Sequence, residues 1–269
     1  MLAVVRAARE QTDAYLLCAT PRSGSSLLCG LLDSSGVAGH PESYFRQPSE
    51  QEYADRWGIV SSPDGAFSYA GYVQAAIAAG TTGNGVFAAR IMWGTLDELV
   101  AKLTPLYPDQ AGSGLDLLTR AFGRTRFVYL RRGDVLAQAV SRLRAEQTNV
   151  WHDETGQEHQ EPEQEPRFDF GQLDELARQI QDDNAAWQRW FASVGVRPCL
   201  VSYEELAAAP VSVAQGVLDF LGLEVPAGRR LQVRHKRLAD DLSAQWVDRY
   251  RREQEVVIAG NDARPVRYS

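Results

Sequence analysis

The sequence predicts an α/β protein whose parallel sheet is flanked by helices, and three features of its pattern agree on this. Short apolar runs alternate along the chain with segments in which apolar residues recur at helical spacing. Strands separated by helices pair in parallel through right-handed crossovers, which place helices on both faces of the sheet. The strand candidate at 126–132 contains four consecutive apolar residues, as expected when both faces are covered. The 269 residues suffice for one domain, predicted to span 1–269.

The elements of the first half follow from apolar spacing and from helix stop signals. The run 14-AYLLC-18 predicts the first strand, and leucines at helical spacing over 27–32 predict a helix that ends near Gly36. The run 86-VFAARIMW-93 predicts the second strand. The pattern of 95-TLDELVAKL-103 predicts the helix that returns from it.

The second half repeats the alternation. The third strand, 126-RFVYLRR-132, leads into a helix over 134–148, for which Asp134 is a suitable N-cap. The last predicted helix docks through Trp246 and Tyr250 and exposes its arginines. The other predicted elements are, in order, a helix over 171–193, a strand over 198–203 and a helix over 211–222, and the last helix covers 243–254.

Composition and charge exclude several classes of protein. A net charge of −7 and a pI near 5.2 argue against nucleic acid or an anionic membrane as the main partner. No apolar run approaches the roughly 20 residues of a membrane-spanning helix, and the first residues do not resemble a secretory signal. We therefore expect a cytoplasmic protein without membrane insertion. Cys18, Cys29 and Cys199 lie in apolar runs and are predicted to be buried thiols without a disulfide.

A polar, acidic and proline-containing segment interrupts the pattern at about 150–169. It predicts an exposed insertion, which is either a lid or a solvated loop. Its histidines and carboxylates share no helical spacing, and Gly156 and Pro162 deny them a rigid scaffold. The sequence therefore predicts no metal site.

The stretch 19-ATPRSGSSLL-28, between the first strand and its helix, resembles a phosphate-binding loop. Aligned with the pattern GxxxxGKS/T, Gly24 takes the second glycine, Ser25 the lysine and Ser26 the hydroxyl. The glycine, the serine hydroxyls and the N–H groups of the helix start form an anion site, with Arg22 as its cation. The predicted anion-binding residues are Arg22, Ser23, Gly24, Ser25 and Ser26. The alternative interpretation is an ordinary strand-to-helix turn.

The missing lysine changes the predicted ligand of this loop. That lysine steadies the outer phosphates of a triphosphate beside magnesium. A sulfuryl donor such as 3′-phosphoadenosine 5′-phosphosulfate (PAPS) carries less charge there and needs no metal. Its 3′-phosphate demands a second anion site, which the stretch 129-YLRRGD-134 offers through Arg131 and Arg132, followed by Ser141 on the next helix. For the two arginines the alternative is a surface ion pair.

At this point the chain resembles the Stf0 family of PAPS-dependent sulfotransferases along nearly its whole length. The resemblance implies the P-loop-like sulfotransferase fold, a 5′-phosphosulfate loop at 20–26 and 3′-phosphate contacts from the region 131–141. It also implies transfer of a sulfuryl group to a hydroxyl, often of a carbohydrate, and a homodimer. The matching stretches are 20-TPRSGSSLL-28, 36-GVAGHPESYF-45, 91-IMW-93, 131-RRGDVLAQAVS-141 and 246-WVDRYRR-252.

One position departs from the family. Its members carry a catalytic glutamate directly before an aromatic pair, in a pattern like GxPxEFF, and this chain has Ser43 there. An attacking alcohol must lose its proton, so the candidate bases are Glu42 and His40, with neither as the third alternative. The rings of Tyr44 and Phe45 either stack on the acceptor or pack in the core.

Arg90 interrupts the apolar run of the second strand near its carboxyl end. A charge in a sheet is costly unless it is paired. We therefore expect Arg90 either to stabilise the transferring sulfuryl group or to form a structural ion pair with a carboxylate.

Taken together, these features predict a metal-independent sulfotransferase that uses PAPS and a small-molecule hydroxyl acceptor such as a carbohydrate or glycoside. One alternative is a small-molecule kinase or NTPase with a degenerate loop. Another is a catalytically inactive nucleotide-binding homologue, which Ser43 favours.

Overall fold

The computed structural model describes residues 13–59, 67–108, 113–151, 164–233 and 241–262. The chain falls into two compact units. The first comprises residues up to Arg131 together with Asp183–Arg234, and the second comprises Arg132–Asp182 and the C-terminal segment from His235. That a single domain spans residues 1–269 stays a prediction.

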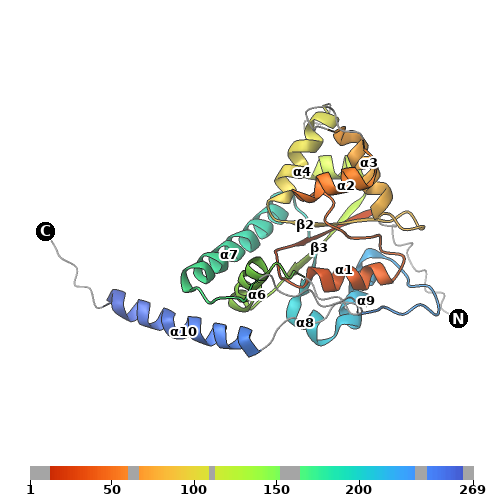
Figure 1. Ribbon diagram of the computed structural model, residues 1–269. Helices are drawn as coiled ribbons and strands as arrows, with labels where there is room; N and C mark the ends of the chain where they lie inside the picture. Colours follow the sequence, from red (N-terminus) through yellow and green to blue (C-terminus); the bar gives the residue numbers. More distant parts are fainter. Residues whose placement is uncertain (1–12, 60–66, 109–112, 152–163, 234–240, 263–269) are drawn as a thin grey trace. The chain divides into compact units, whose positions relative to one another are not determined.

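The first unit contains the sheet that the sequence predicts (Figure 1). In the described part of the chain, its strands are all parallel and lie in the order β2-β1-β3-β4. Their bounds are β1 (Ala14–Ala19), β2 (Phe87–Met92), β3 (Thr125–Arg131) and β4 (Cys199–Ser202). Every predicted strand is confirmed, and so is the α/β fold with a parallel sheet flanked by helices.

Alternation of side chains along the strands divides the apolar core of this unit into two layers. Leu16 of β1 packs in one layer with side chains of α3, α4, α5 and the end of α7. Leu17 packs in the other layer with side chains of α1 and α9. Because both faces of β1 are covered, the strand is apolar throughout.

The helices confirm every predicted helical segment and add several that were not predicted, namely α2, α3, α5, α8 and the short η1. Their bounds are α1 (Ser25–Ser34), α2 (Ser49–Arg56), α3 (Tyr69–Gly80), α4 (Thr95–Leu103), η1 (Thr104–Leu106), α5 (Gly114–Phe122), α6 (Val135–Thr148), α7 (Phe170–Ser193), α8 (Tyr203–Ala208), α9 (Pro210–Leu221) and α10 (Asp241–Asp262).

The second unit is helical and consists of α6, the first part of α7 and α10. Asp134 caps α6 as predicted, because its Oδ1 accepts a hydrogen bond of 2.9 Å from the backbone N–H of Ala137. The buried side chains of Trp246 and Tyr250 fix α10 in the apolar core of this unit, as predicted. The Tyr250 hydroxyl donates to Asp174 at 2.8 Å.

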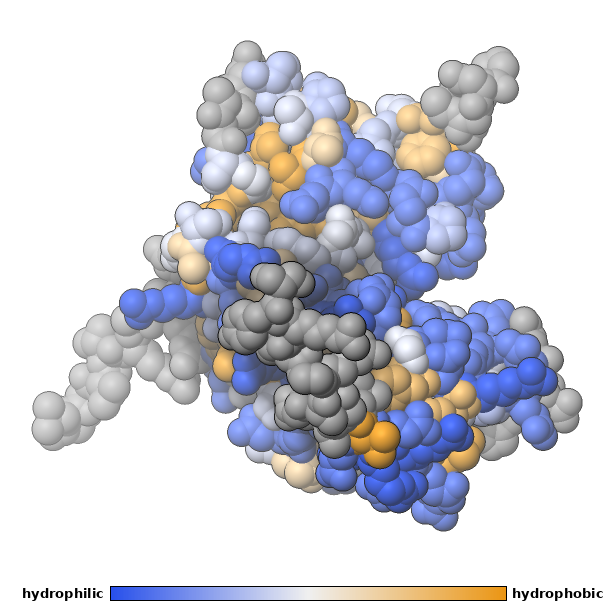
Figure 2. Space-filling model, turned by 90° about the vertical axis from the view of Figure 1, so that its left-hand side faces the viewer, coloured by the Kyte–Doolittle hydropathy of each residue, from blue (hydrophilic) through white to orange (hydrophobic). Residues whose placement is uncertain are grey.

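Several predictions concern the surface. No described helix is long and apolar enough to cross a membrane. On the face drawn in Figure 2 hydrophilic residues predominate, and hydrophobic residues form smaller, separate patches. The described cysteines carry free thiols, buried at Cys18 and Cys29 and half-buried at Cys199. Most of the predicted insertion, 152–163, lies outside the described residues.

Candidate active site

The loop that connects β1 to α1 is shaped by two residues with left-handed backbone conformations. Arg22 has φ 64° and Gly24 has φ 94°. The N–H of Ser23 donates to the carbonyl of Thr20 at 3.3 Å, which closes the turn. A Cβ on Gly24 would lie 2.6 Å from Cδ2 of Tyr203. Glycine is therefore required here both for its backbone conformation and for the close approach of that ring.

The polar groups of this loop fit an anion. The side chain of Ser23 is fully buried, and its hydroxyl has no hydrogen-bond partner among the described residues. Ser25 is buried at the first position of α1, and no side chain caps that helix end. A buried hydroxyl without a partner costs free energy unless something binds it. A helix start with uncapped N–H groups attracts negative charge. These features suit an anion, and the binding of the donor by Arg22, Ser23, Gly24, Ser25 and Ser26 stays a prediction.

Arg90 links this loop to another part of the chain. It lies opposite Leu17 in the sheet, on the face that α1 covers. Its Nη1 donates to Oγ of Ser26 at 3.0 Å, and its Nε donates to Oγ of Ser43 at 2.8 Å. Among the described residues Arg90 forms no ion pair, so the predicted alternative of a structural carboxylate partner is not found there.

The segment that carries the candidate bases runs beside β2. Glu42 forms an isolated parallel bridge with Ala89, and the N–H of Arg90 donates to the carbonyl of Glu42 at 2.9 Å. Ser43 is buried, whereas the side chain of Glu42 is exposed. Burial raises the pKa of the Cys29 thiol to about 12, while the Arg90 guanidinium lowers it and the Glu42 carboxylate raises it.

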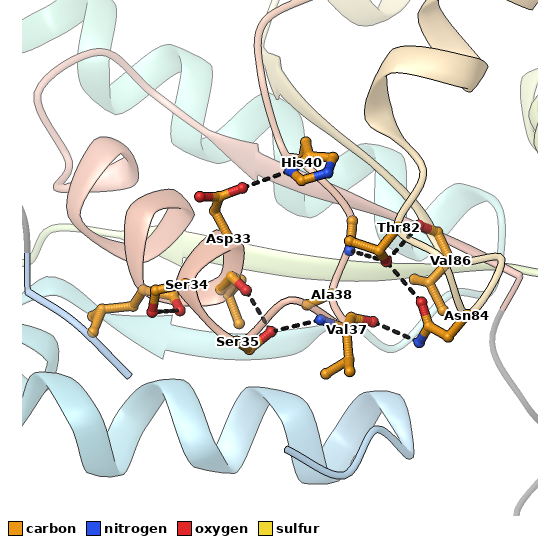
Figure 3. A network of polar contacts seen from close by, with 12 residues as sticks. Asp33, Ser34, Ser35, Val37, Ala38, His40, Thr82, Asn84 and Val86 are labelled. Carbon is orange, nitrogen blue, oxygen red and sulfur yellow. Dashed lines mark hydrogen bonds and ion pairs between the residues drawn. The ribbon is translucent and has the colours of Figure 1, made fainter. Parts of the chain in front are cut away.

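His40 lies at the other end of this segment. Its Nδ1 is 2.6 Å from Oδ1 of Asp33 in the last turn of α1, and Figure 3 shows the two side chains pointing toward one another. Asp33 follows Ser26 by seven residues. A helix rises 1.5 Å per residue, so the two positions are roughly 10 Å apart along α1. His40 is thus held away from the helix start where Arg90 binds.

The aromatic pair after Ser43 belongs to the core. The side chain of Tyr44 is 3% exposed and that of Phe45 is not exposed at all. Both rings pack among other aromatic rings, and the Tyr44 hydroxyl donates to the carbonyl of His40 at 2.9 Å. Core packing is the correct alternative for both, and stacking on an acceptor is wrong because neither ring reaches the surface.

Comparisons with known proteins identify the family of this chain. The family model described as Stf0 sulphotransferase matches residues 14–253, which include the loop, Arg90 and the segment beside β2. The chain belongs to the Stf0 sulphotransferase family. It is therefore an enzyme that transfers a sulfuryl group, and this membership favours sulfuryl transfer over the kinase alternative.

Two trehalose 2-sulfotransferases are similar to this Stf0 protein over most of their length. The protein from Mycobacterium tuberculosis (strain ATCC 35801 / TMC 107 / Erdman) is 31% identical over 261 residues, covering 89% of this chain and 94% of the relative. The protein from Mycolicibacterium smegmatis (strain ATCC 700084 / mc(2)155) is 32% identical over 271 residues, covering 91% and 97%. Among solved structures, the sulfotransferase domain from the Synechococcus PCC 7002 olefin synthase matches with a TM-score of 0.37 and 15% identity, covering 98% of this chain and 92% of that domain.

The predicted 3′-phosphate residues divide between the two units. Arg131 is exposed at the end of β3 in the first unit. Arg132 and Ser141 belong to the second unit, where Arg132 lies three residues before α6 and Ser141 lies within that helix. Their binding of the donor's 3′-phosphate stays a prediction.

Two residues that support the loop were not predicted. The fully buried Trp187 donates through Nε1 to the carbonyl of Ala19, the last residue of β1, at 3.1 Å. The ring of Tyr203 lies against Gly24. Both come from the last third of the sequence, and no local pattern connects them to the loop. Among the described residues, no group of His, Cys, Asp or Glu is arranged to hold a metal ion.

Proposed function

We propose that this Stf0 sulfotransferase uses PAPS as its donor and transfers the sulfuryl group to a hydroxyl of a carbohydrate or glycoside. The observation that carries the proposal is the position of Arg90. One arm of its guanidinium binds Ser26 at the anion loop, and the other binds Ser43 beside the candidate base. The two similar trehalose 2-sulfotransferases support a carbohydrate acceptor.

The donor would be held by the loop and by Arg132 and Ser141, which follow β3 in the sequence. Arg22, Ser23, Gly24, Ser25 and Ser26 would hold the 5′-phosphosulfate, in agreement with the buried hydroxyl of Ser23, which has no partner among the described residues. Arg132 and Ser141 would hold the 3′-phosphate. PAPS, when bound, supplies a sulfuryl group attached to a phosphate that is a good leaving group. Because Ser25 replaces the lysine of triphosphate-binding loops, we propose no metal for this site.

Two side chains act on the acceptor and on the developing charge. Arg90 contributes a fixed positive charge at the loop, where it stabilises negative charge that grows during transfer. Glu42 would accept the proton of the acceptor hydroxyl, whose oxygen forms the new bond to sulfur. The bond between sulfur and the donor's phosphate oxygen would break, and 3′-phosphoadenosine 5′-phosphate would leave. Glu42 is favoured over His40 because its backbone pairs with that of Arg90 itself, whereas His40 pairs with Asp33 near the far end of α1. We further propose a cytoplasmic homodimer.

Calorimetric titration with 3′-phosphoadenosine 5′-phosphate, the desulfonated donor, tests the nucleotide class. Adenosine 5′-phosphate and ATP with magnesium serve as control ligands. We expect binding that depends on the 3′-phosphate and that Arg22→Ala weakens. Arg124→Ala is the matched control variant, because Arg124 precedes β3 at the amino edge of the sheet and pairs with Asp13. Preference for magnesium ATP, or indifference to the 3′-phosphate, would overturn the proposed donor.

An acceptor screen with PAPS then tests the reaction. Mono- and disaccharides are incubated with the enzyme, and products are detected by mass spectrometry as a gain of one SO3 group. We expect turnover of at least one sugar and its loss in Glu42→Gln. Tight binding of the desulfonated nucleotide without turnover of any acceptor would instead support the inactive homologue.

A further inference from the structure

We infer that Tyr53 of α2 binds the acceptor beside Glu42, where its phenol donates a hydrogen bond to a hydroxyl other than the one that reacts. This inference rests on the proposed carbohydrate acceptor and on Glu42 as the proposed base. It assigns a binding role to a side chain that no motif of the sequence indicates.

The side chain of Glu42 projects toward an aromatic cluster on one side of the sheet. Glu42 forms its bridge with Ala89 of β2, and Ala89 belongs to the apolar layer that α3, α4 and α5 cover. Side chains of paired residues project to the same face, and side chains alternate along an extended chain. Glu42 and Tyr44 therefore project toward this layer, whereas Ser43 projects to the other side, where it bonds Arg90.

Helix α2 brings Tyr53 to the same layer. It lies with α3 and α4 on the side of the sheet opposite α1 (Figure 1). The ring centroid of Tyr53 is 5.3 Å from that of Tyr44 and 5.0 Å from that of Trp57, on which it stacks. The guanidinium of Arg56 lies 5.3 Å from the same centroid. These contacts orient the ring before a ligand binds, so binding costs little entropy.

The hydroxyl of Tyr53 differs from those of the tyrosines around it. The Tyr44 hydroxyl donates to the carbonyl of His40 at 2.9 Å, and the Tyr72 hydroxyl donates to the carbonyl of Tyr44. Tyr53 is half-buried, and its hydroxyl forms no hydrogen bond with any described residue. A buried phenol usually has a hydrogen-bond partner. A ligand that contacts this side of the cluster can supply that partner.

The environment of Tyr53 keeps its phenol protonated. Burial raises the pKa of the phenol above its ordinary value, and the Glu42 carboxylate raises it further. The guanidinium groups of Arg56 and Arg90 lower it, and the Glu52 carboxylate adds a smaller rise. Because the net shift of the pKa is upward, the phenol remains a hydrogen-bond donor at neutral pH.

Tyr53 and Glu42 suit two different hydroxyls of one acceptor. Glu42 would take the proton of the hydroxyl that reacts. Tyr53 donates a proton into its hydrogen bond and therefore suits a hydroxyl that is not deprotonated. No hydrogen bond joins the two side chains within the described part of the chain, so each can contact the ligand. An acceptor with a second hydroxyl near the reacting one fits this pair.

Steady-state kinetics with the accepted sugar and its deoxy analogues, each with one hydroxyl replaced by hydrogen, test this contact. We expect Tyr53→Phe to raise KM for the sugar by roughly five- to tenfold, the loss of about one hydrogen bond, with little change in kcat. One deoxy analogue should lack the hydroxyl that Tyr53 binds. For that analogue Tyr53→Phe should have no further effect, because the contact is already lost.

Tyr107→Phe is the matched control. Tyr107 is also half-buried, follows η1, and has the guanidinium of Arg120 5.5 Å from its ring centroid. Like Tyr53, it forms no side-chain hydrogen bond with any described residue. Removal of this hydroxyl should change neither KM nor kcat. Thermal denaturation of both variants checks that each keeps the fold.

A measurement that does not depend on turnover complements the kinetics. The chain has ten tyrosines, so the signals of isotope-labelled tyrosine rings in an NMR spectrum can be assigned to Tyr53 by comparison with Tyr53→Phe. We expect the accepted sugar, in the presence of the desulfonated nucleotide, to shift the Tyr53 signal. The deoxy analogue that is insensitive to Tyr53→Phe should shift it less.

Three outcomes would overturn the inference. If Tyr53→Phe raises KM by the same factor for the sugar and for every deoxy analogue, the phenol contacts no particular hydroxyl and acts only through the fold. Unchanged kinetics, with no shift of the Tyr53 signal, would exclude Tyr53 from the acceptor site. A wild type that binds the nucleotide but turns over no sugar would refute the carbohydrate acceptor itself, and this failure is visible before any variant is made.

Discussion

Replacing Arg90 offers the sharpest test of the site, because its effect on the free energy of unfolding can be measured separately from its effect on kcat. In Arg90→Met the side chain keeps much of its length but loses the guanidinium. The hydroxyls of Ser26 and Ser43 then lose their donor, at 3.0 Å and 2.8 Å. The first of these hydroxyls belongs to the predicted anion loop, and the second lies next to Glu42, the proposed base.

The structural cost follows from these two bonds. A hydrogen bond that involves a charged group contributes about 1.5–3 kcal/mol when buried. Arg90 is only half-buried, so solvent reduces both contributions. We expect the free energy of unfolding to fall by about 2–3 kcal/mol in total. For a chain of this size, Tm should fall by roughly 4–12 °C, and the variant should still fold.

We expect the loss of kcat to be large although the loss of stability is modest. Removal of one preorganised group that stabilises transition-state charge lowers kcat by about 10²- to 10³-fold. We expect kcat of Arg90→Met to fall by this factor, with little change in affinity for the desulfonated nucleotide. Arg90→Lys keeps a charge but cannot span two hydroxyls, so its kcat should lie between those of Arg90→Met and the wild type.

A matched control distinguishes catalysis from general damage to the sheet. Arg126 is a half-buried arginine near the amino end of β3, which β1 separates from the strand of Arg90, and it donates to the carbonyl of Phe220. Arg126→Met should lower Tm comparably and leave kcat unchanged. A folded Arg90→Met with normal turnover, or an equal loss of kcat in both variants, would refute the role assigned to Arg90.

Two further predictions concern the loop and the buried ionisable groups. Gly24→Ala should destabilise the fold by about 2–5 kcal/mol, from the left-handed backbone and the clash with Tyr203. Gly24→Ala should also weaken binding of the desulfonated nucleotide in calorimetry. In the double variant Gly24→Ala/Tyr203→Ala the clash should be relieved, while the cost of the left-handed backbone remains. A free energy of unfolding that Gly24→Ala leaves unchanged would contradict this geometry. Burial raises the pKa of Cys29 and of Tyr129 to about 12, so the folded state keeps these protons after the unfolded chain has released them. Their contribution to stability is therefore complete below about pH 8 and is lost as pH rises toward 12, by up to about 1.4 kcal/mol per pH unit for each group. Urea denaturation across this pH range measures the change in the free energy of unfolding per pH unit. Cys29→Ala should reduce this slope, and an unchanged slope would exclude the thiol as its source.

The sheet could be predicted from the sequence because its strands are covered on both faces. A buried parallel strand such as β1 needs an unbroken apolar run, and that signal is visible without any knowledge of its partners. The helices α2 and α3 were missed for the opposite reason. The sequence of α2 is almost entirely polar, and that of α3 is apolar on most sides, so neither shows a clear stripe.

The helix α5 had a signal that could have been used. Ser113 accepts from the backbone N–H of Asp116, and Asp116 bonds back to Ser113, which is a capping box in its reciprocal form. The amphipathic pattern that follows is short, which explains why the segment 114–122 was overlooked.

Candidate site residues could be proposed from the sequence where they are neighbours in the chain or stand out within one element. The loop 20–26 could be recognised because its glycine and serines are consecutive, and Arg90 because a charge within an apolar strand needs a partner. The partners themselves could not be foreseen. Ser26 and Ser43 lie 64 and 47 residues from Arg90 in the sequence, and only the packing of α1 and the segment 39–43 beside β2 brings them together.

The nature of these partners explains how Arg90 can remain useful to the reaction. An arginine paired with a carboxylate is held firmly, but its charge is largely compensated. Here the two arms are held by the neutral hydroxyls of Ser26 and Ser43, so the guanidinium is oriented while its charge stays available for an anion. A carboxylate at position 43, as the sequence resemblance predicts for the family, would face Arg90. With Ser43 in that position, the adjacent and exposed Glu42, whose backbone carbonyl accepts from the N–H of Arg90, is the carboxylate that we propose as the base.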